Sequence, residues 1–198
     1  MPEPERVAVF GGAFDPPHRG HVGLARQAKL ELGVPQLVVL VSADPGHKRV
    51  ATPADARLRM AQAAFPDEDV RLDEHARTVE LLRAHPEWDD PVLVLGADQF
   101  AAFPGWQEPE EVLRRARLAV GTRPGFAQSR LDDVLAKLAR PERVRFFELA
   151  EPVPAASREL RERLERGEDV GDELPAAVAA VIRRERLYRP SRGYTSGA

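Results

Sequence analysis

The sequence contains no cysteine, which excludes disulfide bonds and thiolate metal sites. No apolar stretch approaches the roughly 20 residues that a membrane-spanning helix needs, so we do not expect a membrane as a partner. The net charge of −3 argues against a general nucleic-acid-binding protein, whose surface would be strongly basic. Residues 1–5 have neither the basic start nor the apolar run of a signal peptide. From these absences we expect a cytoplasmic location.

The sequence does contain a regular alternation of short apolar runs and amphipathic segments. The apolar runs predict strands at 7–10, 37–42, 70–72, 91–95, 117–121 and 143–149. The amphipathic segments predict helices at 22–32, 53–65, 78–85, 109–115, 129–138, 157–166 and 175–186. Apolar strands that alternate with helices predict an α/β fold, a Rossmann-like doubly wound parallel sheet covered on both faces. We expect one domain over residues 1–188 and a flexible tail over 189–198.

The most informative segment is the turn between the first predicted strand and the first predicted helix, residues 11–21, GGAFDPPHRGH. Its glycines let backbone N–H groups approach phosphate oxygens, and the helix N-terminus adds about half a positive charge. His18 and His21 are three residues apart, so on a helical turn they point to one side. The pattern favours a polyphosphate site at the carboxyl end of the first strand. The alternative is a pair of buried turn histidines that bond to backbone carbonyls.

The segment His18-Arg19-Gly20-His21 resembles the HxGH element of the HxGH nucleotidyltransferases. Within that superfamily, residues 11–21 are most similar to bacterial nicotinate-nucleotide adenylyltransferases. Three further segments agree in order and approximate spacing: PGHK at 45–48 with the PPHK loop, LGAD at 95–98 followed by Trp106 with the LGAD…W segment, and 174–188 with the closing helix. The resemblance spans about residues 6–188.

The resemblance implies an HxGH-type nucleotidyltransferase fold and adenylyl transfer from ATP to nicotinate mononucleotide, giving deamido-NAD and pyrophosphate. The attacking phosphate is already ionised at pH 7, so the barrier is mainly geometric and electrostatic. We expect Mg²⁺ to arrive with ATP, held mostly by phosphate oxygens and water, because no metal site made wholly of protein groups is visible in the sequence. The expected partners are small-molecule substrates, and a homodimer is left open.

By the same resemblance, four side chains carry the catalysis: His18, His21, Lys48 and Arg161. The histidines would contact the ATP phosphates, and one of them would stabilise the transition state. Lys48, on the loop after the second strand, would reach the β- or γ-phosphate, although alone it would be taken for a solvated surface lysine. Arg161 lies on a late helix that in the family holds the triphosphate.

That late helix departs from the family motif ISSTxxR. Here residues 155–161 read AASRELR, so Ala156 stands at the first serine and Arg158 at the threonine. Ser157 is predicted as the helix N-cap, one turn before the arginine on the same face. Either Arg158 replaces the lost contacts or ATP is held more weakly. The alternative is an ordinary solvated helix rich in charge.

The remaining residues expected at the nucleotide site fall into two groups. The turn would contribute Gly11, Gly12, Ala13, Phe14, Asp15 and Gly20. Asp15 would lie near the reacting phosphates by resemblance, and its alternative role is a turn former. The later loops would contribute Gly96, Asp98, Trp106, Arg123, Ser157 and Arg158.

Three of the loop residues have a stated role and an alternative. Asp98 could accept a hydrogen bond from a ribose hydroxyl, or it could cap the short helix that follows. Trp106 could stack on a pyridine ring, or it could anchor the edge of the core. Arg123 could pair with a phosphate or carboxylate, or belong only to a turn.

The resemblance is weakest over residues 66–90, where family members line the nicotinate pocket. Only Thr78, predicted as a helix N-cap, and the helix after it follow the pattern, and Arg77 stands at the tyrosine position. A pyridine carboxylate could be met by Arg77 or by backbone N–H groups. Another phosphorylated acceptor, nicotinamide mononucleotide or phosphopantetheine, stays open, as does a regulator that binds nucleotide without turnover. A class I synthetase domain is disfavoured because no KMSKS-like loop is present.

Overall fold

The computed structural model describes residues 7–46, 49–123, 125, 127–150 and 155–189. Lys48, one of the four predicted catalytic residues, and residues 190–198 of the predicted tail lie outside these ranges.

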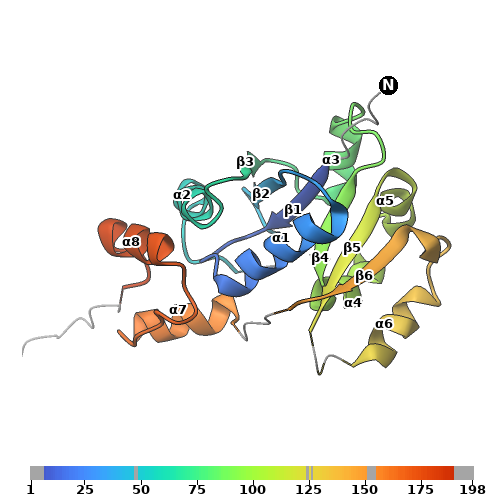
Figure 1. The fold of residues 1–198 in the computed structure, drawn as a ribbon. Coiled ribbons are helices and arrows are strands. Elements are labelled where there is room, and N and C mark those ends of the chain that lie inside the picture. The colour runs from blue at the N-terminus through green and yellow to red at the C-terminus, as the bar shows by residue number, and fades with distance from the viewer. Residues whose placement is uncertain (1–6, 47–48, 124, 126, 151–154, 190–198) are drawn as a thin grey trace, which may run out of the picture.

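Six strands form one sheet in the order β3-β2-β1-β4-β5-β6, and every neighbouring pair is parallel (Figure 1). The strands are β1 (Ala8–Gly12), β2 (Val38–Ser42), β3 (Asp69–Asp73), β4 (Val92–Gly96), β5 (Arg117–Thr122) and β6 (Val144–Glu148). The strand order reverses between β1 and β4, so a crevice is expected beyond their carboxyl ends. The predicted doubly wound parallel sheet is confirmed.

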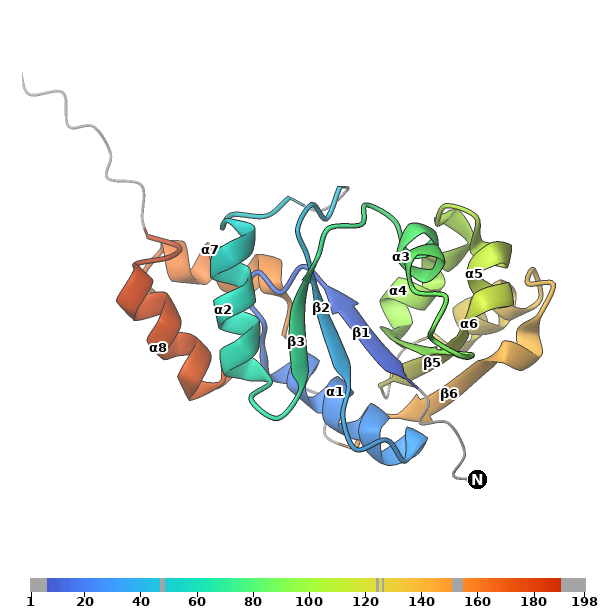
Figure 2. The same cartoon turned by 90° about the horizontal axis from the view of Figure 1, so that it is seen from above.

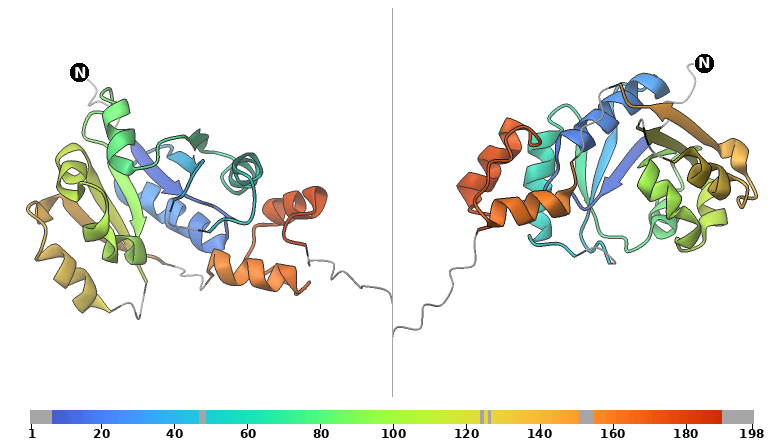
Figure 3. Two further views of the ribbon diagram at one scale, coloured as in Figure 1. Left: turned by 180° about the vertical axis from the view of Figure 1, so that it is seen from behind. Right: turned by 90° about the horizontal axis from the view of Figure 1, so that it is seen from below.

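Helices connect or follow these strands, and all but the short α4 lie close to the positions predicted from the sequence. They are α1 (Arg19–Leu32), α2 (Ala54–Ala64), α3 (Thr78–Ala84), α4 (Ala97–Ala101), α5 (Pro109–Arg115), α6 (Gln128–Leu135), α7 (Ser157–Glu165) and α8 (Ala176–Glu185), with 3₁₀ turns η1 (Phe103–Gly105) and η2 (Pro141–Arg143). Figure 3 shows α7 and α8 together at one end of the molecule, where α8 packs on α2. Within the described ranges no helix is both long and apolar enough to cross a membrane.

The core consists of two layers, one on each face of the sheet, because successive strand residues point to opposite sides. Phe10 belongs to the core cluster that includes buried residues of α1, α2, α7 and α8. Its neighbour Val9 belongs to the cluster that includes those of α3, α4, α5 and α6. Figure 2 shows α1 on one side of the sheet and α3, α4 and α5 on the other. The sheet is therefore covered on both faces, which leaves the carboxyl ends of its strands as the place for a ligand.

Two predicted helix caps are wrong by one residue. Arg77 (φ −137°, ψ 143°) caps α3 and Ala156 (φ −128°, ψ 128°) caps α7, so Thr78 and Ser157 are the first helical residues. An N-cap is the residue at which extended backbone turns into helix. In both helices this turn occurs one residue before the residue that carries the hydroxyl. The Ser157 hydroxyl instead donates to the Pro16 carbonyl at 3.0 Å, which fastens the start of α7 to the turn after β1.

Candidate active site at the carboxyl edge of the sheet

A cavity of about 500 Å³ lies beyond the carboxyl ends of β1, β4 and β5. Of the sixteen residues expected at the site, fourteen line it: Gly11, Gly12, Ala13, Phe14, Asp15, His18, Gly20, His21, Gly96, Asp98, Arg123, Ser157, Arg158 and Arg161. Trp106 lies elsewhere, in a second cavity described below. The fold thus brings together segments that are up to 150 residues apart in the sequence.

The two histidines face each other at the start of α1. His18 is the N-cap and His21 is the third helical residue, and their ring centroids are 3.7 Å apart. The backbone N–H of His18 donates to Nδ1 of His21 at 3.2 Å. Because Nδ1 accepts, the proton of a neutral His21 ring lies on Nε2, which suits that nitrogen to donate to a phosphate oxygen. The predicted placement of both side chains on one side is confirmed.

His18 is the more buried of the pair, with 7% of its surface exposed. Burial lowers its pKa from 6.5 to about 4, so the ring is neutral at neutral pH. Within the described part of the chain its Nδ1 is buried and has no hydrogen-bond partner. An unpartnered buried polar atom costs free energy, and a ligand rich in oxygen atoms can recover that cost. This fits the phosphate site predicted from the turn.

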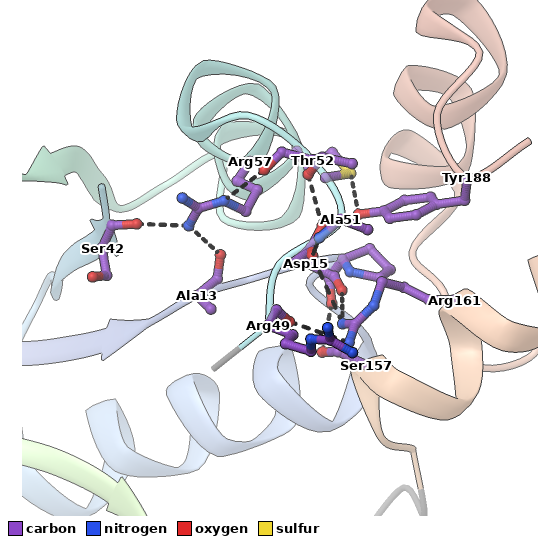
Figure 4. A network of polar contacts seen from close by, with 12 residues as sticks. Ala13, Asp15, Ser42, Arg49, Ala51, Thr52, Arg57, Ser157, Arg161 and Tyr188 are labelled. Atoms are coloured by element: carbon purple, nitrogen blue, oxygen red, sulfur yellow. Dashed lines mark hydrogen bonds and ion pairs between the residues drawn. The ribbon is translucent and has the colours of Figure 1, made fainter. Parts of the chain in front are cut away.

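Asp15 is 1% exposed, and protein groups satisfy its carboxylate (Figure 4). The carboxylate accepts from the Ala51 N–H at 2.6 Å, the Thr52 hydroxyl at 2.7 Å and the Tyr188 hydroxyl at 2.6 Å. Burial and the neighbouring carboxylate raise the pKa of Tyr188 well above its ordinary value, so the phenol keeps its proton and donates. Asp15 therefore joins the turn after β1 to the segment before α2 and to Tyr188, three residues after the end of α8.

Arg161 is committed to the same turn. Its Nη1 donates to the Asp15 carbonyl at 2.6 Å and lies 3.8 Å from the Asp15 carboxylate, while Nη2 donates to the Arg49 carbonyl at 3.4 Å. Arg158, in contrast, has a 79% exposed side chain, and its Nε is 3.7 Å from Glu162. On this helix, Arg158 is the cation more open to a ligand in the cavity.

Arg57 is a buried arginine that sequence reasoning missed. It is 1% exposed and donates to four carbonyls, those of Ala13 (2.9 Å), Ser42 (2.6 Å), Ala43 (2.9 Å) and Thr52 (3.2 Å). Burial lowers its pKa. It ties the turn after β1 to the end of β2. The sequence signal that could have identified Arg57 as buried is its position on α2, one helical turn before apolar residues of the core face.

A second cavity, of about 800 Å³, lies beside the first and shares residues 11–13, Asp98 and Gln99 with it. Trp106 and Arg77 line this second cavity. The Trp106 ring also packs against the core residue Phe103, with centroids 5.2 Å apart. Trp106 thus anchors the edge of the core, which was one of its two expected roles, and it also lines a cavity; its stacking on a pyridine ring stays a prediction.

Two charged residues lie at the rim of the first cavity. Arg123 Nη2 is 3.9 Å from the Asp98 carboxylate, and both side chains are exposed. Asp98 does not cap α4, because the cap is Gly96, whose N–H donates to the Gln99 side chain at 3.3 Å. The Asp98 carboxylate is consequently available to either cavity.

Comparison with known proteins identifies the family. The family model described as cytidylyltransferase-like matches residues 9–163. A Bordetella avium protein named "Probable nicotinate-nucleotide adenylyltransferase" is 35% identical, covering 94% of this chain and all of its own length. A Rubrobacter xylanophilus protein of the same name is 31% identical, covering 97% and 96%. The solved Plasmodium falciparum nicotinic acid mononucleotide adenylyltransferase complexed with NaAD shares the fold, with a TM-score of 0.75 at 18% identity over 93% of this chain and 98% of its own. The chain belongs to the cytidylyltransferase-like family, and within it to the nicotinate-nucleotide adenylyltransferases.

Proposed function

We propose that this chain transfers the adenylyl group of ATP to nicotinate mononucleotide, giving deamido-NAD and pyrophosphate. The observation that carries the proposal is a pair of cavities that meet at residues 11–13 and Asp98. One cavity holds the histidine pair and the arginines, as a triphosphate requires, and the other presents an indole ring and a cation. The relatives' names, and the solved neighbour's NaAD, support the same reaction.

The geometry supports the following roles. The triphosphate occupies the first cavity, so the α-phosphorus lies near the wall that the two cavities share, and the acceptor phosphate attacks from the second. Nε2 of His21 donates to a phosphate oxygen as charge moves onto the leaving pyrophosphate. Neutral His18 adds a second polar contact without placing a buried charge beside its neighbour. Because the nucleophile is already ionised, rate enhancement comes from alignment and charge stabilisation.

We further propose that Mg²⁺ enters with ATP and offsets part of the phosphate charge. In this proposal the ion is held mainly by phosphate oxygens and water. The homodimer and the cytoplasmic location stay predictions.

A second candidate acceptor is favoured by one observation. Arg77, which stands at the family's tyrosine position, lines the acceptor cavity, and its Nε donates to the Gln107 side chain at 3.2 Å, beside Trp106. A guanidinium there suits a carboxylate, as nicotinate mononucleotide carries, but its N–H groups can also donate to the amide oxygens of phosphopantetheine.

The test is incubation with ATP, Mg²⁺ and one acceptor at a time: nicotinate mononucleotide, nicotinamide mononucleotide or phosphopantetheine. Pyrophosphate release is the readout, and nicotinate mononucleotide is expected to give the highest kcat/KM. A tenfold higher kcat/KM with another acceptor would replace the proposed substrate. ATP binding without pyrophosphate release from any acceptor would instead establish a nucleotide-binding regulator.

A further inference from the structure

Residues 49–52, which precede α2, are held in place by side chains from distant parts of the chain. Arg49 and Val50 line the first cavity, and residues 49–51 belong to no helix or strand. Within the part of the chain that the structure describes, the hydrogen bonds of this segment go to the side chains of Asp15, Arg161 and Arg57. Its position beside the cavity is therefore set by tertiary contacts rather than by its own backbone structure.

Asp15 makes the two shortest of these contacts. One carboxylate oxygen accepts the Ala51 N–H at 2.6 Å, and the other accepts the Thr52 hydroxyl at 2.7 Å (Figure 4). Hydrogen bonds to an ionised carboxylate are about twice as strong as neutral ones. The guanidinium of Arg161 reaches the same segment at the Arg49 carbonyl and also bonds the Asp15 carbonyl. The side chains of Asp15 and Arg161, which are far apart in the sequence, thus both hold residues 49–52.

Tyr188 supports this arrangement from the carboxyl-terminal end of the chain. Its hydroxyl donates at 2.6 Å to the same Asp15 oxygen that accepts from Thr52. A buried carboxylate is costly unless donors satisfy it, so each donor stabilises the position of Asp15 and of whatever Asp15 binds. Tyr188 lies three residues after the end of α8, which connects the packing of α8 on α2 to the wall of the cavity.

We propose that Asp15 is a positioning residue that holds residues 49–52 against the ATP cavity, and that Tyr188 and Thr52 keep its carboxylate in place. The inference rests on the proposed function in that the ligand of this cavity is ATP. In this proposal Asp15 acts through residues 49–52, which connect the predicted loop at 45–48 to α2, and not through contact of its own carboxylate with the phosphates. Loss of either hydroxyl lets residues 49–52 leave the cavity wall for part of the time, and the affinity for ATP falls with the fraction of molecules that are competent to bind it.

The test uses two single-hydroxyl deletions, Tyr188→Phe and Thr52→Val, because Asp15→Asn would disturb three donors at once and risks unfolding. The matched control is Glu68→Gln. Glu68 accepts the Leu37 N–H at 2.7 Å and the Lys29 amine at 2.7 Å, at the opposite, amino-terminal end of the strands. The control therefore weakens a charge-assisted hydrogen bond without touching the cavity.

Three quantities are measured: ATP affinity by calorimetry, KM for each substrate, and the amide exchange rate of Ala51 by NMR. Each hydroxyl deletion is expected to weaken ATP binding and raise its KM about fivefold, by lowering the competent fraction. Exchange at Ala51 speeds up, because its N–H loses a fixed acceptor. The kcat at saturating ATP and the KM for nicotinate mononucleotide stay within about twofold, and Glu68→Gln lowers only the melting temperature.

The outcomes separate this inference from the proposed function. If both variants bind ATP as tightly as the wild type and the Ala51 amide proton exchanges at the wild-type rate, the positioning role is overturned while the proposed function stands. It is overturned as well if Glu68→Gln loses the same ATP affinity, because general destabilisation then explains the effect. A wild-type protein that binds no ATP overturns both.

Discussion

The burial of His18 makes a prediction about stability and pH. Its pKa is lowered from 6.5 to about 4 in the folded protein because the ring is desolvated. Between these two pH values the unfolded chain binds a proton that the native protein does not bind. Stability therefore rises with pH in this window: the contribution is fully present above pH 6.5 and is lost as the pH falls toward 4.

The magnitude follows from the same two pKa values. Each pKa unit corresponds to about 1.4 kcal/mol, so the full contribution is roughly 3 kcal/mol. About 2.5 kcal/mol of it is lost between pH 7.5 and pH 4.5. A stable domain of this size has only about 5–15 kcal/mol in total, so the effect is large enough to measure.

The assay is urea unfolding of the wild type and of His18→Gln at several pH values between 4.5 and 7.5. Glutamine does not titrate, so the free energy of unfolding of the variant should fall about 2.5 kcal/mol less than that of the wild type over this range. The comparison uses the difference between the two proteins in how the free energy of unfolding depends on pH. Any pH-independent loss of stability caused by the substitution therefore cancels. Identical slopes would mean that native His18 takes up a proton as readily as the unfolded chain, and the lowering of its pKa by burial would then be refuted.

Three further predictions test the catalytic, specificity and packing arguments. His21→Ala should lower kcat at least about a hundredfold, or about 3 kcal/mol, with little change in stability. Pyrophosphate release and thermal melting check this, and near-normal turnover contradicts it. Arg77→Gln should lower kcat/KM for nicotinate mononucleotide about tenfold through loss of one charged contact, and change that for nicotinamide mononucleotide less than twofold. An equal loss on both acceptors would remove the residue from carboxylate recognition. Gly121→Ala should cost about 1–3 kcal/mol in urea unfolding, because the added methyl overlaps Leu24 Cδ1 and lies 3.2 Å from the Phe147 ring. Wild-type stability would show that the buried Leu24 side chain shifts without cost.

The role of Asp15 illustrates why a family motif does not carry a mechanism by itself. The resemblance implies an acidic residue near the reacting phosphates, and Asp15 does line the cavity. Its carboxylate nevertheless binds groups that lie 36, 37 and 173 residues away in the chain. No local pattern links these positions, because they meet only when β1, α2 and the segment after α8 pack together.

The altered motif at the start of α7 also depends on tertiary contacts. From the sequence, Ser157 and Arg161 were candidates for direct phosphate contacts. In the fold, Ser157 bonds the Pro16 carbonyl and Arg161 bonds the carbonyls of Asp15 and Arg49. Arg158, which stands where the family has threonine, stays exposed at the cavity. The choice between these residues depends on how α7 docks on the turn, which is a tertiary contact.

The sequence by itself determined the local structure: the order and type of the elements, the parallel sheet, and the two histidines on one side of the first helical turn. Those features follow from short apolar runs that alternate with segments of 3.6-residue periodicity, and from a spacing of three residues within one helical turn. The tertiary structure alone decided which residue capped α3 and α7, which carbonyls Arg57 bonds, and what Asp15 and Arg161 hold. Such contacts join residues far apart in the chain, so they depend on how the elements pack and leave no periodic trace in the sequence.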